Sequence, residues 1–217
     1  MDNFITKERS LCIKGVAIIL MLIHHCFGFP EWYYISIKYV ELDIVLYGIK
    51  FTTKICVAIF AFITGWGFAY TSNKSIYSSI KRIKNLLMKY WFVMMLILLL
   101  AIITGFRYQD KYVFLLELFG LYTPIMIFGW YVYFYILSML FLPLVYHFFN
   151  DLKLTLIIAF ISLLISEKIY LIIHNNILRD VIAHFLFYFP IIVLGYLMAY
   201  HNLYSKIFEK NLNYQKI

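Results

Sequence analysis

Two neighbouring histidines and a lysine stand out in the first apolar stretch, IKGVAIILMLIHHCFGFP, which covers residues 13–30. Ionisable side chains within a membrane segment are costly, so they usually face a protein interior or a hydrated cavity and serve a function. A neutral imidazole can accept a proton from a hydroxyl group, which makes His25 the best candidate in the chain for a general base. The competing interpretation is a histidine that hydrogen-bonds a backbone group or a tyrosine at the membrane interface.

The relation between Lys14 and His25 depends on the helix that carries them. Eleven residues at about 100° each give three full turns plus about 20°, so both side chains share one helix face, about 16 Å apart. His24 points about 100° away from this face. No metal site is expected at the histidine pair, because adjacent helical side chains diverge and no acidic residue or histidine follows four positions later.

A second group of ionisable residues lies between positions 71 and 89. This group can bind phosphate groups, or it can fix the membrane topology and contact anionic lipid. Charge alone favours the second interpretation. The stretch contains five basic residues and no acidic one, namely Lys74, Lys81, Arg82, Lys84 and Lys89.

The elements that position these groups are predicted to be membrane helices. Of the 217 residues, 64% are hydrophobic and 14% are charged, whereas soluble domains have about 45–50% apolar and about 25% charged residues. We therefore expect an all-α fold, a polytopic transmembrane helix bundle that forms one domain over residues 1–217.

Six apolar runs approach the length of about 20 residues that a membrane-spanning helix needs. The segment 112–128 is also apolar, but Glu117, Gly120 and Pro124 interrupt it, so we expect an extra interfacial or re-entrant piece there. The stretch 71–89 is expected to be a loop. The six runs cover residues 11–29, 55–70, 90–106, 131–149, 154–173 and 181–200.

The charges are distributed unevenly over this topology. Six spans place both termini and the loops near 71–89 and 150–153 on one side, which then has 12 basic and 4 acidic residues and carries the whole net charge of +8. Basic residues mark the cytoplasmic side of a membrane protein. Both termini are therefore expected in the cytoplasm, and the basicity indicates topology and not a nucleic-acid partner.

Five motifs follow one another along the chain. KGVAIILMLIHH, IFAFITGWGFAY, IKRIKNLLMKYW, GWYVYFYILSMLFLPLV and HFLFYFPIIVLGYLMAY resemble, in the correct order, those of the acyltransferase-3 family of bacterial integral-membrane acyltransferases. In the family's first motif a histidine follows an arginine by eleven positions, and here Lys14 and His25 occupy these places. Lys81 and Arg82 match the basic pair of its third motif, whereas Asn85 replaces a later arginine and Met88 a proline.

The resemblance implies that an acyl group, usually acetyl, passes from cytoplasmic acyl-CoA to a sugar hydroxyl. The acceptor would be a cell-surface polysaccharide or its lipid-linked precursor, the location the bacterial inner membrane, and acetyl-CoA a substrate, with no permanently bound cofactor. Glu117 could orient His25, although a solvated interfacial carboxylate is the more ordinary interpretation. The residues assigned on this basis are catalytic His25, Lys14 and Glu117; donor-binding Arg82, Lys81, Lys84 and Lys89; and substrate-binding His24, Trp130, Tyr135 and His184.

The family fold has about ten spans, whereas six are expected here. The chain is therefore interpreted as the N-terminal portion of that fold, truncated at the C-terminus, for which a partner chain could supply the missing helices. Two other hypotheses stay open: an inactive family member, and a polytopic transporter or flippase component. Transporters often place charges at the membrane midplane, whereas this chain has most of its charges near the span ends.

Overall fold

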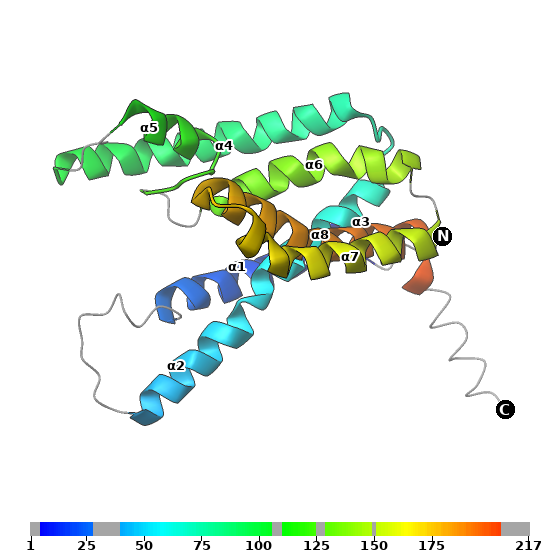
Figure 1. Ribbon diagram of the computed structural model, residues 1–217, viewed down its shortest axis with the longest axis horizontal. Helices are drawn as coiled ribbons and strands as arrows, with labels where there is room; N and C mark the ends of the chain where they lie inside the picture. Colours follow the sequence, from blue (N-terminus) through cyan, green and yellow to red (C-terminus); the bar gives the residue numbers. More distant parts are fainter. Residues whose placement is uncertain (1–4, 28–39, 106–109, 125–128, 149–150, 205–217) are drawn as a thin grey trace. The chain divides into compact units, whose positions relative to one another are not determined.

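A computed structural model describes residues 5–27, 40–105, 110–124, 129–148 and 151–204. Within these ranges all regular secondary structure is helical, which confirms the predicted all-α fold (Figure 1). The chain forms two compact units, the first from residues 1–70 and 194–217 and the second from 71–193. The helices are α1 (Lys7–Phe27), α2 (Val40–Thr53), α3 (Ile55–Ala69), α4 (Ile76–Ile103), α5 (Lys111–Leu118), α6 (Trp130–Phe148), α7 (Leu152–Ile172) and α8 (Asn176–Tyr200).

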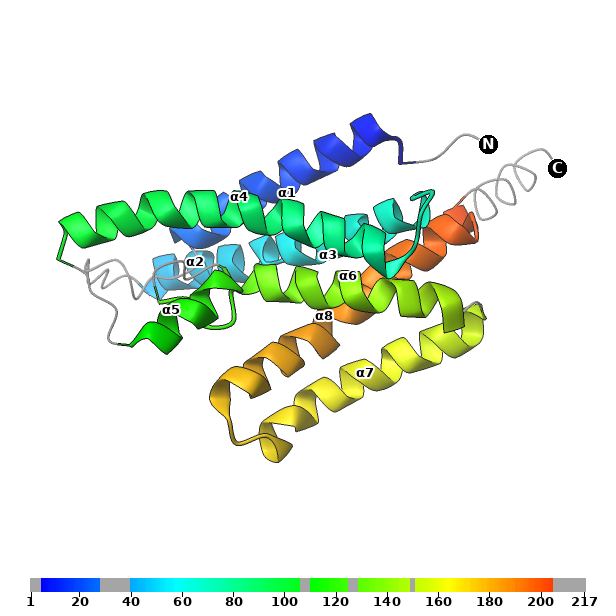
Figure 2. The same cartoon turned by 90° about the horizontal axis from the view of Figure 1, so that it is seen from above.

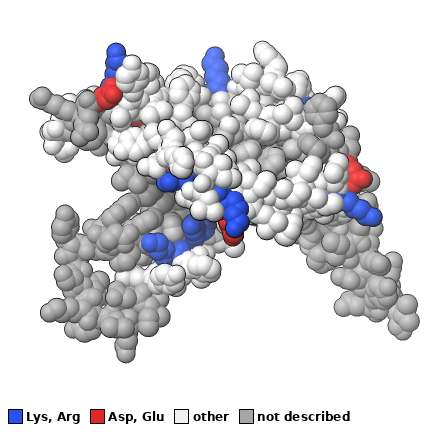
Figure 3. Space-filling model, viewed as in Figure 1, with Lys and Arg blue, Asp and Glu red and all other residues white. Residues whose placement is uncertain are grey.

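Six helical stretches in the described part of the chain are long and apolar enough to cross a membrane, as the sequence predicts. Their outward-facing side chains are apolar too: on α4, Leu99, Leu100 and Ile103 are between 58% and 80% exposed. Contact of such apolar surfaces with lipid carries no free-energy cost, whereas their contact with water would be unfavourable. On the face drawn in Figure 3, charged side chains are few and scattered among uncharged ones.

The second span differs from the prediction at its start. It was expected to begin at Ile55, but it runs from Val45 to Ala69 and includes the end of α2. Lys50 and Lys54 therefore lie within a candidate membrane helix. Long apolar neighbours on both sides keep the stretch hydrophobic despite these two lysines, and lysine side chains can extend along a helix towards the interface.

Helix α4 corrects the expected loop over 71–89. The hydroxyl of Ser75 accepts a hydrogen bond from the backbone N–H of Ser78 at 3.3 Å, so that α4 begins at Ile76. A serine at this position stabilises a helix start because it satisfies one of the unpaired N–H groups. The basic residues from Lys81 to Lys89 are therefore presented on a helix of 28 residues and not on a loop.

Helix α5 is too short to cross a membrane, since its eight residues extend only about 12 Å. Two side chains of α4 fix its C-terminal end: the Tyr90 hydroxyl donates to the carbonyl of Glu117 at 2.8 Å, and the Trp91 indole N–H to that of Leu118 at 2.7 Å. The last carbonyls of a helix lack partners within it. Side chains from α4 supply such partners here, so α5 is held along α4 (Figure 1).

In the first unit, α1 packs against α2 and α3. The end of α8 approaches α3 so closely at Gly195 that a Cβ atom there would overlap the carbonyl oxygen of Phe62. One residue further along α8, the ring of Tyr196 lies 6.0 Å from that of Phe68. Small residues permit such close helix contacts in membranes, which gives the glycine of the LGYL sequence a packing role.

In the second unit, α4 packs against α6 through a cluster of buried side chains, Leu87, Tyr90, Met94 and Val132. Helix α7 and the first part of α8 form an antiparallel hairpin (Figure 2), in which the Ser162 hydroxyl lies 3.3 Å from the backbone carbonyl of Leu186. The start of α6 lies beside Gly120, just after α5, because a Cβ atom at Gly120 would meet the carbonyl oxygen of Gly129 and the side chain of Val132, and α6 packs alongside α4. The ends of α6 therefore present residues to opposite ends of this unit.

Candidate functional site

In the first unit, His24 is tied to α2. Its Nδ1 lies 3.2 Å from the Oγ1 of Thr53, and the side chain is 9% exposed. The hydroxyl of Thr53 already donates to the backbone carbonyl of Ile49, so its oxygen accepts from His24 and Nδ1 carries the proton. This hydrogen bond joins α1 to α2. It gives His24 a structural role in addition to its predicted role in substrate binding.

His25, the predicted general base, is partly buried near the end of α1, whereas Lys14 is exposed. Helix α1 runs without interruption from Lys7 to Phe27, so the expected placement of the two residues on one helix face follows from its geometry. The His25 ring lies 5.3 Å from that of His24. Its role as a base stays a prediction.

Two lysines add positive charge to this end of the first unit. Lys50 and Lys54 both lie close enough to His24 for their positive charges to act on its imidazole. The sequence motifs do not include either lysine. Only the helical path of α2, which brings residues 50–54 back beside the end of α1, shows that they belong near the histidine pair.

In the second unit, the structure separates Arg82 from the three lysines of its motif. Lys81, Lys84 and Lys89 are exposed, whereas Arg82 is half-buried and its Nη2 donates to the hydroxyl of Thr71. Arg82 also lies within electrostatic range of Tyr135, a predicted substrate-binding residue. Of the four predicted donor-binding residues, Arg82 is the one that a neighbouring side chain holds in a fixed orientation.

Thr71 orients a second cation. The ammonium group of Lys74 donates to the backbone carbonyl of Thr71 at 3.0 Å and lies 5.2 Å from the centre of the Tyr146 ring. Lys74 lines a cavity of about 360 Å³ between the start of α4 and the end of α6. The other lining residues are Ser75, Ile76, Pro143, Leu144, Tyr146 and His147.

At the other end of α6, two predicted substrate-binding residues come together. The indole of Trp130 stacks on the imidazole of His184, with 4.9 Å between ring centres and 27° between planes, and on the phenol of Tyr188, at 5.7 Å and 29°. His184 and Tyr188 are four residues apart on α8, so they share one helix face. This spacing is the signal that could have identified Tyr188 from the sequence.

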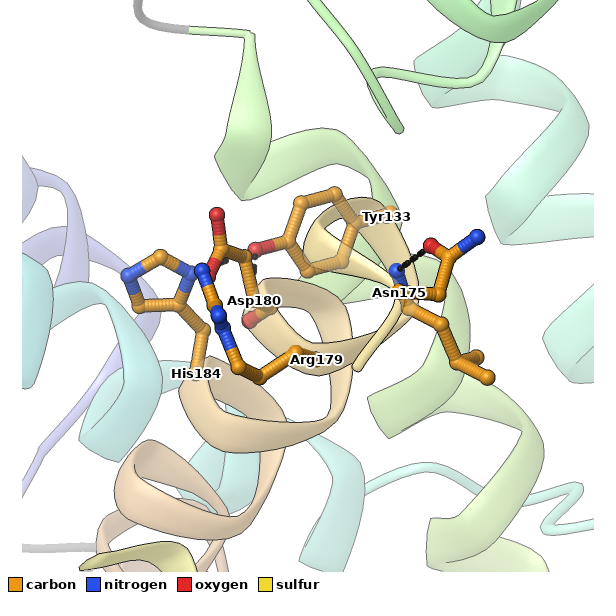
Figure 4. A network of polar contacts seen from close by, with 6 residues as sticks. Tyr133, Asn175, Arg179, Asp180 and His184 are labelled. Carbon is orange, nitrogen blue, oxygen red and sulfur yellow. Dashed lines mark hydrogen bonds and ion pairs between the residues drawn. The ribbon is translucent and has the colours of Figure 1, made fainter. Parts of the chain in front are cut away.

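A polar network surrounds His184 (Figure 4). The hydroxyl of Tyr133 lies 2.6 Å from Nδ1 of His184 and 3.5 Å from the carbonyl oxygen of Asp180. The short contact joins the phenol to the imidazole, and which of the two groups donates depends on the imidazole tautomer. Nearby, Arg179 pairs with Asp180 at 3.4 Å and lies over the ring of Tyr170 at 5.0 Å.

Glu117 is not the solvated carboxylate that the sequence favoured. Its side chain is completely buried at the end of α5, in the second unit, whereas His25 belongs to the first. The burial follows from the way Tyr90 and Trp91 draw the end of α5 onto α4. Among the residues that the structure describes, no three His, Cys, Asp or Glu side chains are grouped closely enough to hold a metal ion.

Comparison with known proteins confirms the resemblance of the motifs. The family model of the acyltransferase-3 family, described as an acyltransferase domain, matches residues 12–213. No curated protein and no solved structure matches the chain. The family match covers nearly the whole sequence, and the described helices include six that are long and apolar enough to span a membrane. The chain therefore belongs to the acyltransferase-3 family and is a multi-pass membrane acyltransferase.

Proposed function

We propose that this protein transfers an acyl group, in the simplest case acetyl, from acyl-CoA to a sugar hydroxyl of a cell-surface polysaccharide or its lipid-linked precursor. It would act in the bacterial inner membrane with both termini in the cytoplasm, as the distribution of basic residues favours. The observation that carries the proposal is the orientation of Arg82 by Thr71, within a chain that the family match identifies as an acyltransferase.

Arg82 is suited to the phosphate groups of the donor. A guanidinium group presents several N–H donors in a fixed plane and binds phosphate oxygens in pairs. One N–H of Arg82 is used by the Thr71 hydroxyl, and this contact fixes the plane in which the others point. The exposed Lys81, Lys84 and Lys89 would attract the anionic donor to this surface from a distance.

His25 is proposed as the general base. It takes the proton of the acceptor hydroxyl while the oxygen attacks the carbonyl carbon of the thioester. The new C–O bond forms as the C–S bond breaks, and the CoA thiolate leaves and takes up a proton. The products are an ester and free CoA, so the reaction needs no oxidant and no metal ligand from the protein.

The acceptor sugar is proposed to bind at the Trp130 end of α6. The indole and the stacked imidazole of His184 offer an aromatic surface, with the hydroxyl of Tyr133 as a polar group beside it. From Trp130 to His147, α6 extends about 25 Å, close to the thickness of the membrane's hydrocarbon core. Donor headgroup and acceptor would thus be held at opposite ends of the second unit, and the thioester end of the donor would extend from its headgroup towards the acceptor hydroxyl for direct attack.

Thiol release measured with the purified protein in nanodiscs tests this function. With acetyl-CoA and a candidate glycan, wild-type protein should release CoA, and His25→Ala should lose nearly all turnover. Arg82→Met should raise the KM for acetyl-CoA by about 10-fold or more, as expected from the loss of a charged hydrogen bond, while Lys153→Met serves as the matched control. Equally negligible turnover in wild type and His25→Ala would reject the enzymatic function.

A further inference from the structure

The cavity between the start of α4 and the end of α6 contains groups that none of the family motifs accounts for. Its volume of about 360 Å³ lies in the range of small-molecule sites, about 300–1,000 Å³. All of its lining residues belong to the second unit. The cavity is therefore formed by one compact part of the protein, from the turn before α4 and the last turn of α6.

The polar side of this cavity favours an anion. Lys74 is half-buried, and one of its three N–H donors is used by the Thr71 carbonyl at 3.0 Å, so two others can reach a ligand. The ring of Tyr146 below the ammonium group limits the rotation of this side chain. His147 lines the same cavity, and its imidazole can bind a proton or donate a hydrogen bond to an anion. None of the described lining residues carries a carboxylate.

The other wall of the cavity is apolar. The side chains that form this wall are Ile76, Pro143 and Leu144. Pro143 lies inside α6, and because proline has no N–H group, one backbone carbonyl of the helix lacks its usual donor. A ligand that fits both walls combines a phosphate with a less polar portion. Inorganic phosphate alone would leave the apolar wall uncovered, whereas a phosphorylated nucleoside or a phospholipid headgroup would cover it.

We propose that this cavity binds the phosphorylated nucleoside end of the acyl donor, with Lys74 and His147 as its phosphate ligands. The identity of the ligand rests on the proposed function, because acyl-CoA is the phosphorylated nucleotide of that reaction. Thr71 couples the cavity to Arg82, since its carbonyl holds Lys74 and its hydroxyl holds Arg82. One residue thereby holds two cations, of which Lys74 lines the cavity.

Calorimetric binding of adenosine 3′,5′-bisphosphate to the full chain tests this site, because this probe has the phosphates and nucleoside but no thioester. The protein is held in phosphatidylcholine nanodiscs. Lys74→Met is expected to weaken binding by about 10-fold or more, as the loss of a charged hydrogen bond predicts. Lys74→Arg should retain most of the affinity, which shows that a weakened Lys74→Met protein is not simply misfolded.

Lys153→Met is the matched control, since Lys153 is an exposed lysine at the start of α7 that does not line the cavity. Equal affinity of wild type and Lys74→Met for the probe would overturn the proposal. A second arm uses nanodiscs with phosphatidylglycerol. If anionic lipid binds in a Lys74-dependent way and the nucleotide does not bind, the occupant is a lipid headgroup and the nucleotide assignment is wrong.

The binding assay and the turnover assay can reject the proposed cavity and the proposed reaction independently of each other. Lys74-dependent binding of the probe without any thiol release would support the cavity and reject the proposed reaction. Thiol release that depends on His25 but not on Lys74, together with unchanged probe binding in Lys74→Met, would support the reaction and reject the cavity.

Discussion

The phenol oxygen of Tyr133 on α6 lies 2.6 Å from Nδ1 of His184 on α8, across 51 residues of sequence. A hydrogen bond of this length within the second unit fixes both the first part of α8 against α6 and the orientation of the imidazole. The stacking of Trp130 on the same imidazole shows that His184 is held from two directions by α6.

Tyr133→Phe tests this hydrogen bond. Because it removes the hydroxyl and keeps the ring, we expect the free energy of unfolding to fall by about 0.6–1 kcal/mol, the usual contribution of such a bond in membrane proteins. Denaturant titration in detergent measures the change. Tyr122→Phe is the control, since this tyrosine is exposed; equal effects of the two substitutions would contradict a specific Tyr133–His184 contact.

Because Tyr90 and Trp91 anchor α5 to α4, their substitution should increase local unfolding of α5. Tyr90→Phe combined with Trp91→Phe removes the two donors to the carbonyls at the end of α5, so this short helix should open more often. Limited proteolysis after Lys111 should become several-fold faster, while the global unfolding midpoint falls by less. An unchanged cleavage rate would mean that other contacts hold α5.

The contact between Gly195 and Phe62 predicts a strong sensitivity to one methyl group. Gly195→Ala places a Cβ against the Phe62 carbonyl oxygen, and overpacking of this kind costs about 1–3 kcal/mol. Thermal unfolding in detergent gives the loss directly.

Gly67→Ala on α3 provides the matched control for Gly195. A Cβ at Gly67 meets no atom within 4 Å, so the substitution should be neutral or stabilising by about 0.5–1 kcal/mol, because alanine favours helix over glycine. Equal effects of the two alanine substitutions would be incompatible with the close approach of α8 to α3.

The hydrogen bond between His24 and Thr53 predicts an energetic coupling between α1 and α2. In a double-mutant cycle with His24→Leu and Thr53→Val, the two substitutions should be non-additive by about 0.6–1 kcal/mol. His25→Leu paired with Thr53→Val should instead be additive. Turnover provides a second readout, since His25→Leu should abolish thiol release and Thr53→Val should only reduce stability.

Much of the fold could be predicted from composition and hydropathy, because a membrane-spanning helix must satisfy its backbone groups internally and needs a continuous apolar stretch. The placement of Lys14 and His25 on one face of α1 also follows from sequence spacing alone. The motif positions of Trp130 and His184 indicated related roles, and the structure places their rings in contact.

Other features depended on contacts between segments far apart in the sequence. The hydropathy of Glu117 indicated exposure, but Tyr90 and Trp91 hold the end of α5 against α4, and this contact buries the carboxylate. Likewise, Arg82 has the same charge as its neighbouring lysines. It is the hydrogen bond to the Thr71 hydroxyl that holds the guanidinium group in one orientation.

The sequence alone therefore determined that the chain crosses a membrane several times, which residues can carry charge or accept protons, and which helix face presents His25. These properties are local, since they depend on the hydrophobicity and helical period of continuous segments. The tertiary structure decided which side chains are buried, which cations are oriented, and where a cavity opens. Burial and hydrogen bonding arise between helices, so their pattern is fixed only when the helices pack.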